Sequence, residues 1–251
     1  MTRIIMSGCN GAMGQKITAI AAADPDAEIV AGIDICDDGH QSYPVFSQIS
    51  DCDVEADVII DFSTPKIISD ILAYSKAKKV PAVLCTTGYS KEQLAEIEAA
   101  SKETALLKSA NMSLGINTLI HLLKEAAKVL ATEGFDVEIV EKHHNQKLDA
   151  PSGTALALAD SVNEAMNNQY EYIYDRSDRR SKREKKELGI SAVRGGTIVG
   201  EHEVIFAGVD EVVTFSHTAY SKNVFAKGAV AAAKFLAGKE PGFYDMADVI
   251  G

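Results

Sequence analysis

The stretch RIIMSGCNGAMG, residues 3–14, decides the fold that this chain is predicted to adopt. Its first five residues predict a buried β-strand, and a helix is expected from about residue 13 to residue 23. Between them, Gly8 would permit a tight turn, Gly11 the approach of a pyrophosphate, and Gly14 close packing of helix on strand. The spacing Gly-x-x-Gly-x-x-Gly differs from the common Gly-x-Gly-x-x-Gly, so a turn without a ligand is an alternative reading.

Four more strands are expected to alternate with helices in the first half of the chain. Such alternation predicts a parallel sheet with helices on both faces, which is the Rossmann-like α/β class. Ligands of such sheets bind beyond the carboxyl ends of the strands. The predicted strands are residues 28–33, 56–62, 80–85 and 105–108, and an amphipathic helix is predicted over residues 91–104.

Polar residues follow several of these strands where each strand ends. Asp34 follows the second strand, at the position where an acidic side chain accepts hydrogen bonds from an adenosine ribose. Asn111 and Ser113, close to the expected nicotinamide position, could equally be the start signal of a helix over residues 116–132. The predicted ligand edge of the sheet therefore collects the glycine turn, Asp34 and residues 62–64, 86–88 and 109–115.

The residues after Asp34 predict a preference for NADH over NADPH. The 2′-phosphate of NADPH needs a nearby cation, commonly an arginine just after the acidic position. The four positions after Asp34 hold no basic residue and two acidic ones. Use of NADPH is the alternative if Arg3 or Lys16 reaches the site from the neighbouring strand or helix.

A second stretch, EKHHNQKLDAPSGTAL over residues 141–156, concentrates residues that bind anions and move protons. A short strand is predicted over residues 137–140 and a helix over residues 155–166, so the stretch is expected to be a loop between rigid elements. Ser152 or Thr154 would cap this helix. The free N–H groups at a helix start attract an anion such as a carboxylate.

Three side chains of this stretch, His143, His144 and Lys147, would face the same anion and could transfer protons. Each feature taken singly has a structural reading, as a solvated histidine or an ordinary helix cap. A metal site of His143, His144 and Asp149 is disfavoured, because neighbouring histidines point apart on a strand-like backbone. The combination of the residues favours a functional site.

The second half of the chain has a different pattern. Strand-like segments joined by short turns predict a mostly antiparallel sheet with one face on helices, a second domain of α+β type. An alanine-rich helix over residues 223–236 is expected to cross back and pack on the first domain. The strand-like segments are residues 190–193, 203–206 and 211–217.

Composition limits the classes of function. The chain has 251 residues, a net charge of −11 and a pI of about 5.0, which disfavour a nucleic-acid partner. No apolar run predicts a membrane span and the first residues do not resemble a signal peptide, so a cytoplasmic location is expected. Four cysteines without a Cys-x-x-Cys pair are expected to be reduced thiols. The charged run 176–186 is expected to be a solvated, mobile loop.

These residues together resemble one family, the 4-hydroxy-tetrahydrodipicolinate reductases, over nearly the whole chain. Residues 141–155 are similar to the family's signature around its catalytic histidine and lysine. Met112, Asn145 and Lys222 stand where an aromatic residue, an arginine or similar group, and an arginine are common. Supporting similarities lie at residues 8–14, 86–88, 110–115, 194–196, 200–202, 216–217 and 221–222.

The resemblance implies an NAD(P)H-dependent oxidoreductase of lysine and diaminopimelate biosynthesis. It would reduce 4-hydroxy-tetrahydrodipicolinate to tetrahydrodipicolinate with loss of water. The alternatives are a reductase of another small dicarboxylate and a non-catalytic nucleotide-sensing protein of the same fold. The implied organisation is a dinucleotide-binding domain of residues 1–114 with 223–251, and a substrate-binding domain of residues 115–222 that forms a homotetramer.

The resemblance also implies roles for individual residues. His143 and Lys147 would be catalytic, as the acid/base group and the proton donor. The substrate would be bound by His144, Lys147, Ser152, Gly153 and Thr154, and no metal is implied. The implied cofactor-binding residues are Gly8, Cys9, Asn10, Gly11, Ala12, Met13, Asp34, Cys85, Thr86, Thr87, Ser109, Ala110, Asn111 and Met112.

Overall fold

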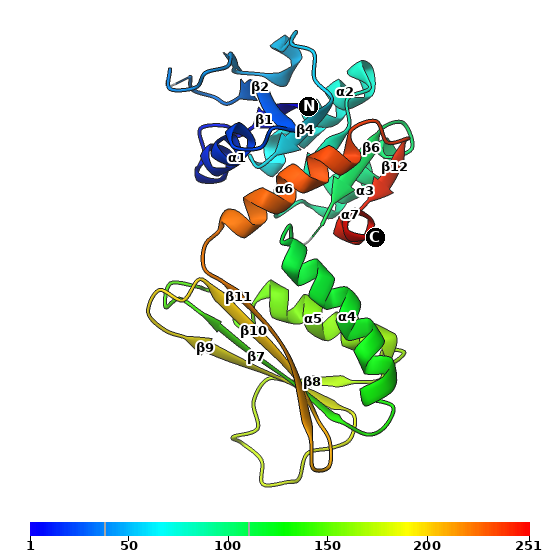
Figure 1. The fold of residues 1–251 in the computed structure, drawn as a ribbon. Coiled ribbons are helices and arrows are strands. Elements are labelled where there is room, and N and C mark those ends of the chain that lie inside the picture. The colour runs from blue at the N-terminus through cyan, green and yellow to red at the C-terminus, as the bar shows by residue number, and fades with distance from the viewer. Residues whose placement is uncertain (38, 110) are drawn as a thin grey trace. The chain divides into compact units, whose positions relative to one another are not determined.

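The chain folds into two compact units, each with its own sheet (Figure 1). A computed structural model describes residues 1–37, 39–109 and 111–251. The first unit holds residues 1–114 and 223–251, and the second holds residues 115–222. Among the described residues, no helix is both long and apolar enough to cross a membrane.

The first unit contains a seven-stranded sheet in the order β12-β6-β5-β4-β1-β2-β3. Every neighbouring pair is parallel, which confirms the Rossmann-like class. Its strands are β1 (Thr2–Ser7), β2 (Ala27–Ile33), β3 (Val45–Phe46), β4 (Val58–Asp61), β5 (Ala82–Leu84), β6 (Ala105–Lys108) and β12 (Gly242–Tyr244). The two- and three-residue strands β3 and β12 were not predicted, because so few residues carry no periodic signal.

Successive residues of β1 point into two different cores, which explains why this strand reads as a continuous apolar run. Ile4 packs in a core with helices α1 and α6, whereas Ile5 packs in a core with α2 and α3. Helices therefore cover both faces of the sheet. They are α1 (Ala12–Ala22), α2 (Ile68–Lys78), α3 (Lys91–Ala100), α6 (Asn223–Leu236) and the short α7 (Met246–Ile250).

Helix α6 packs very close to the segment that follows β6. A Cβ atom at Gly228 would lie 1.6 Å from the carbonyl oxygen of Met112. Met112 itself is buried in the core that α6 shares with α1. Helix α6 therefore packs directly against the segment that follows β6.

The second unit contains a five-stranded sheet in the order β11-β10-β7-β9-β8. The sheet is mixed rather than mostly antiparallel: β10 is antiparallel to β7 and β11, but β9 is parallel to β7 and β8. The reason is that the chain leaves β7 through helix α5, and such a crossover returns the next strands in a parallel direction. The strands are β7 (Asp136–His143), β8 (Glu171–Ile173), β9 (Glu187–Arg194), β10 (Gly200–Ala207) and β11 (Val212–Ala219).

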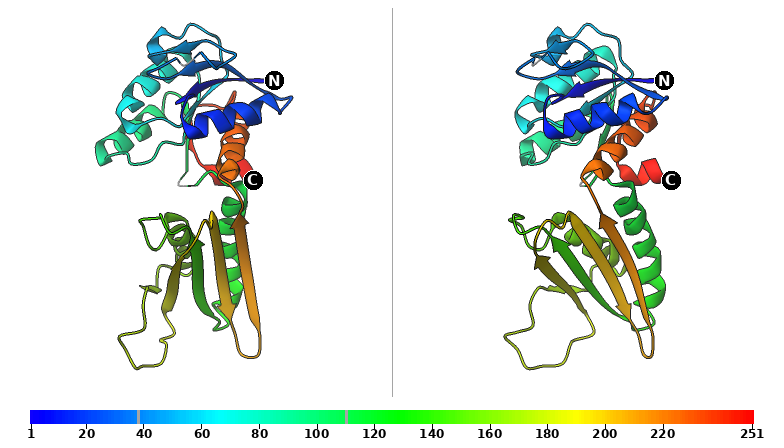
Figure 2. Two further views of the ribbon diagram at one scale, coloured as in Figure 1. Left: turned by 90° about the vertical axis from the view of Figure 1, so that its left-hand side faces the viewer. Right: turned by 60° about the vertical axis from the view of Figure 1, so that its left-hand side comes forward.

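Helices α4 (Leu114–Leu130) and α5 (Gly153–Ala165) cover one face of this sheet (Figure 2). The inward residues of β7 alternate with outward ones, as expected for a strand with one solvated face. On the inward face, Val137 and Ile139 lie in the core, and Glu141 and His143 continue the same row. Strand β7 therefore extends into the stretch that was predicted to be a loop.

The charged run 176–186 is a largely exposed loop, as predicted, but three of its arginines tie it to the sheet, which was not predicted. Arg176 donates to both oxygens of Glu138 on β7, at 3.0 and 2.7 Å. Arg183 reaches the same carboxylate at 2.9 Å, and Arg179 pairs with the buried Glu187 at 2.5 Å. The sequence shows the arginines but not the strand carboxylates that they meet.

Candidate active site

The glycine turn after β1 has the backbone that a dinucleotide site requires. Gly8 has a φ of 81°, a left-handed conformation that favours glycine, and a Cβ there would lie 2.6 Å from the carbonyl oxygen of Phe62. A Cβ at Gly14 would lie 2.2 Å from the carbonyl oxygen of Gly8, so only glycine lets α1 approach the turn. Gly11 caps α1 without a side-chain hydrogen bond. The N–H groups at this helix start suit a pyrophosphate.

Asp34 lies beside this turn at the end of β2. Its Oδ2 atom accepts a hydrogen bond from the backbone N–H of Asn10 at 3.0 Å. A carboxylate fixed beside the glycine turn suits the hydroxyls of an adenosine ribose. Asp38 and the predicted cofactor residue Ala110 lie outside the described residues.

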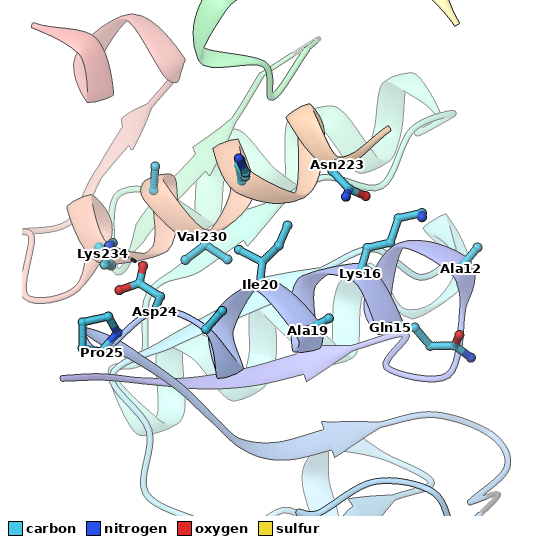
Figure 3. A pocket seen from close by; sticks show the side chains of 13 residues that line it. Ala12, Gln15, Lys16, Ala19, Ile20, Asp24, Pro25, Asn223, Val230 and Lys234 are labelled. Atoms are coloured by element: carbon cyan, nitrogen blue, oxygen red, sulfur yellow. Dashed lines mark hydrogen bonds and ion pairs between the residues drawn. The ribbon is translucent and has the colours of Figure 1, made fainter. Parts of the chain in front are cut away.

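One of the two cations that could have served a 2′-phosphate is engaged by carboxylates. The guanidinium of Arg3 forms ion pairs with Asp57 at 2.9 Å and with Glu55 at 3.2 Å. Lys16 lines a groove of about 890 Å³ that runs between α1 and α6 (Figure 3). At the other end of this groove, Lys234 pairs with Asp24 at 2.7 Å.

A buried carboxylate at the end of β4 organises the polar residues at this edge. Asp61 accepts hydrogen bonds from the hydroxyls of Ser7 at 2.9 Å, Ser63 at 2.5 Å and Thr86 at 2.7 Å. Burial raises the pKa of the Cys85 thiol, and the charge of Asp61 raises it further, so Cys85 is a packing residue with an inert thiol. None of the four cysteines forms a disulfide, as predicted.

The segment before α4 has the hydrogen bonds of a helix start, which was one of its two predicted roles. The Asn111 side chain accepts a hydrogen bond from the backbone N–H of Ser113 at 2.8 Å, one residue before α4 begins. The Ser109 hydroxyl donates to the carbonyl oxygen of Asn111 at 3.1 Å. Because the Met112 side chain is buried, this residue can offer a ligand little beyond its backbone.

In the second unit, the ends of two strands and the start of one helix meet at a buried carboxylate. Glu141 is fully buried, and His143 contacts it through Nδ1 at 2.6 Å. Arg194, at the end of β9, donates to both of its oxygens at 2.7 and 2.8 Å. The backbone N–H of Ser152 completes the set at 3.0 Å. Sequence reasoning missed the Glu141 and Arg194 contacts, although Glu141 and His143 share a strand face at a spacing of two.

Opposing effects act on the ionisation of Glu141. Burial alone would raise its pKa, but the hydrogen bonds from Arg194, His143 and Ser152 outweigh burial and lower the pKa. The same hydrogen bond and charge raise the pKa of Arg194. The pair is therefore ionised at neutral pH.

His202 on β10 is the second buried histidine of the cluster. Its ring meets that of His143 edge-on, with centroids 5.1 Å apart, and its Nε2 atom lies 3.2 Å from the Ser152 hydroxyl. Burial, reinforced by His143, lowers the pKa of His202 to about 4. His202 is thus neutral at neutral pH and shares a hydrogen bond with the Ser152 hydroxyl.

The remaining predicted substrate residues lie at the start of α5 and in the preceding loop. Ser152 is the N-cap, as one of the two predicted possibilities, and accepts from the N–H of Ala155 at 3.1 Å. No atom lies within 4 Å of a Cβ built on Gly153, so this helix start is open. Lys147 forms an ion pair with Asp149 at 2.8 Å. Among the described residues, no group of His, Cys, Asp and Glu has an arrangement suited to a metal.

Comparison with known proteins agrees with this combination of a glycine turn and a histidine cluster. Residues 2–112 match the family description "Dihydrodipicolinate reductase, N-terminus", and residues 115–250 match its C-terminus. The chain belongs to the dihydrodipicolinate reductase family. A family member from Caldanaerobacter subterraneus, described as 4-hydroxy-tetrahydrodipicolinate reductase, is 52% identical over 250 residues, which cover 100% of this chain and 98% of that protein.

Other members of the family and solved structures give the same picture. A reductase of the same description from Clostridium tetani is 52% identical over 98% of this chain and 96% of its own length. Dipicolinate-bound dihydrodipicolinate reductase from Paenisporosarcina sp. TG-14 superposes with a TM-score of 0.83 at 23% identity and full coverage of both chains. An aspartate dehydrogenase from Thermotoga maritima shares the fold more distantly, with a TM-score of 0.53 at 10% identity, over 96% of this chain and 98% of its own.

The buried neutral His202 predicts loss of stability in acid for this member of the family. Because the pKa of His202 falls from 6.5 to about 4 on folding, the unfolded chain binds the proton more readily. The contribution of neutral His202 to the free energy of unfolding is complete above about pH 6.5. It falls by on the order of 3 kcal/mol as the pH is lowered toward 4. Urea unfolding across this range measures it. His202→Gln should flatten the pH dependence, whereas His121→Gln, at an exposed histidine, should not.

Proposed function

We propose that this chain is an NADH-dependent 4-hydroxy-tetrahydrodipicolinate reductase of lysine and diaminopimelate biosynthesis. The observation that carries the proposal is the meeting of His143, a buried Glu141 and the open start of α5, in a chain that matches the family over its whole length. The first unit would bind the dinucleotide, and the second would bind the substrate. The glycine turn and Asp34 fit a dinucleotide through the backbone approach and carboxylate described above.

The proposed chemistry follows from the substrate. When bound, the nicotinamide supplies a hydride to the conjugated ring of the dehydrated substrate. The electron pair left on the ring must take up a proton, and His143, whose Nδ1 faces Glu141, would take up a proton at Nε2 and deliver it to the ring. Lys147 would act as proton donor and would also attract a carboxylate of the substrate. His144 and the N–H groups of Gly153 and Thr154 would hold the carboxylates at the helix start.

One assay tests the proposed reaction. Pyruvate, aspartate semialdehyde and the synthase that precedes this step are mixed, this protein is added, and the loss of nicotinamide absorbance is followed. We expect rapid oxidation of NADH that depends on both substrates and on the synthase. If NADH were oxidised with another small dicarboxylate but not in this coupled assay, the alternative reductase would be favoured. If no dicarboxylate led to NADH oxidation, a nucleotide-sensing protein would be favoured.

Cofactor preference is a further part of the proposal. A 2′-phosphate would approach the Asp34 carboxylate, while Arg3 is held by Asp57 and Glu55. Like charges a few ångströms apart at a surface cost on the order of 1 kcal/mol. We therefore expect kcat/KM to favour NADH over NADPH by roughly tenfold. Ile35, which is 94% exposed, offers the test position.

The variant Ile35→Arg should shift the ratio of the two kcat/KM values toward NADPH, measured at saturating substrate and fixed ionic strength. Ile35→Gln, which loses the apolar side chain without adding charge, serves as the control and should leave the ratio unchanged. A wild-type preference for NADPH, or no shift with the arginine, would mean that Asp34 does not face the ribose.

Assembly and location complete the proposal. We expect a homotetramer built through the second unit, because β11 is an edge strand with Val212 exposed and the family resemblance implies tetramers. A molar mass of a monomer, measured by light scattering at micromolar concentration, would contradict the homotetramer. The four free cysteines support a cytoplasmic location. The dicarboxylate substrate is the only partner proposed besides the cofactor and the other subunits.

A further inference from the structure

We infer that Glu141 is a positioning residue that fixes which ring nitrogen of His143 carries the proton, and that Arg194 holds Glu141 in place for this purpose. The inference rests on the proposed function only in the role given to His143. It goes beyond that function because neither Glu141 nor Arg194 belongs to the implied set of site residues. The inference stands on the geometry of one fully buried carboxylate.

Three N–H groups donate hydrogen bonds to the Glu141 carboxylate, and its fourth contact is with a ring nitrogen of His143. One oxygen, Oε1, accepts from the Ser152 N–H at 3.0 Å and from Arg194 at 2.7 Å. The other, Oε2, accepts from Arg194 at 2.8 Å and lies 2.6 Å from Nδ1 of His143. An ionised carboxylate can only accept hydrogen bonds, so the hydrogen must be on Nδ1. Neutral His143 therefore leaves Nε2 as the atom that can take up a proton.

The surroundings of Nε2 are open in the way that proton transfer requires. Among the described parts of the chain, Nε2 of His143 has no hydrogen-bond partner. A Cβ atom at Gly200, on the neighbouring strand β10, would lie 3.1 Å from Nε2, so glycine leaves this side clear. His202 contacts the ring edge-on rather than through a hydrogen bond to Nε2. One nitrogen is thus fixed and the other is left free.

Charged and titratable groups surround His143 on several elements. Glu141 lies on its own strand, Arg194 on β9, and the histidines 202 and 217 on β10 and β11. Arg194 also donates to the carbonyl oxygen of Asp149 at 2.6 Å. Asp149 pairs with Lys147 in the same loop. The Arg194 side chain therefore connects the carboxylate that orients His143 to the loop that carries the second proposed catalytic residue.

The variant Glu141→Gln tests the inference because an amide has one accepting and one donating end. Its oxygen is expected to face the Ser152 N–H and Arg194, which are donors only. The NH₂ group then faces Nδ1 of His143, and the ring proton moves to Nε2. We expect ¹⁵N NMR of the imidazole to report Nδ1–H in the wild-type protein and Nε2–H in the variant, with kcat lower by roughly tenfold to a hundredfold. The same tautomer in both proteins would overturn the inference.

A matched control lies on the same strand. Glu138 is also a glutamate of β7, and its carboxylate accepts hydrogen bonds from two guanidinium nitrogens of Arg176. It lies on the opposite face of the sheet from Glu141. Glu138→Gln therefore removes a comparable ion pair without touching His143. It should leave the tautomer unchanged and kcat within about twofold of wild type. An equal loss of kcat in both glutamine variants would identify Glu141 as a residue of general structural importance only and overturn the inference.

A second variant keeps the test valid if Glu141→Gln does not fold, since it leaves the charge of Arg194 uncompensated in a buried place. The double variant Glu141→Gln with Arg194→Met removes both charges. The Ser152 N–H remains and still selects the amide oxygen, so the NH₂ group should again face Nδ1 and the Nε2–H tautomer of His143 should appear. A single wild-type tautomer with unchanged kcat would overturn the inference. Because the tautomer is read without substrate, this result is independent of the coupled assay, whose failure would overturn only the proposed reaction.

Discussion

Replacing His143 with alanine is expected to lower kcat by about a hundredfold or more, the usual scale for a lost proton-transfer group. The structure gives the physical reason: the ring is held by a 2.6 Å hydrogen bond to a buried carboxylate and keeps its other nitrogen open. Lys147→Ala should have an effect of similar size. The affinity for NADH should hardly change in either variant, because both residues belong to the second unit.

Steady-state kinetics in the coupled assay, together with direct NADH titration, measure the two quantities separately. His121→Ala, on the exposed surface of α4, is the control for histidine loss and should keep normal kcat. Near-normal turnover in His143→Ala or in Lys147→Ala would show that the role proposed for that residue is wrong. A thermal unfolding curve for each variant separates loss of chemistry from loss of fold.

Replacing Gly14 with alanine is expected to destabilise the first unit strongly and to weaken NADH binding by at least tenfold. The new methyl group would lie 2.2 Å from the carbonyl oxygen of Gly8 and 2.7 Å from the Cα atom of Cys9. Both contacts are with backbone, which cannot move aside without shifting α1 away from the turn. Overpacking of this kind costs typically 1–3 kcal/mol or more.

The measurements for Gly14→Ala are the free energy of unfolding in urea and the dissociation constant for NADH. Gly195→Ala is the matched control, because no atom lies within 4 Å of its Cβ position and its φ is not positive. It should change neither quantity by much. A Gly14→Ala protein with normal stability and normal NADH affinity would show that the close approach of helix and turn is unimportant.

The sequence alone determined the first unit in outline. Strand, glycine turn and helix are local features, and a run of apolar residues such as Ile4 and Ile5 is buried wherever a parallel sheet is covered on both faces. The strands β1 and β2 and the position of Asp34 follow from residues that are close in the chain. The family could also be predicted, because its signature over residues 141–155 is continuous.

Only the tertiary structure decided which side chains meet. Glu141 and Arg194 are 53 positions apart, and Ser7 and Asp61 are 54 apart, so no local pattern reports these contacts. Strand pairing brings them together: β7 lies beside β9, and β1 beside β4. Pairing direction likewise depends on how a crossover returns the chain, which is why the second sheet is mixed. Hydrophobic periodicity specifies which face of a strand is buried, but the free energy of assembling distant strands selects its neighbours.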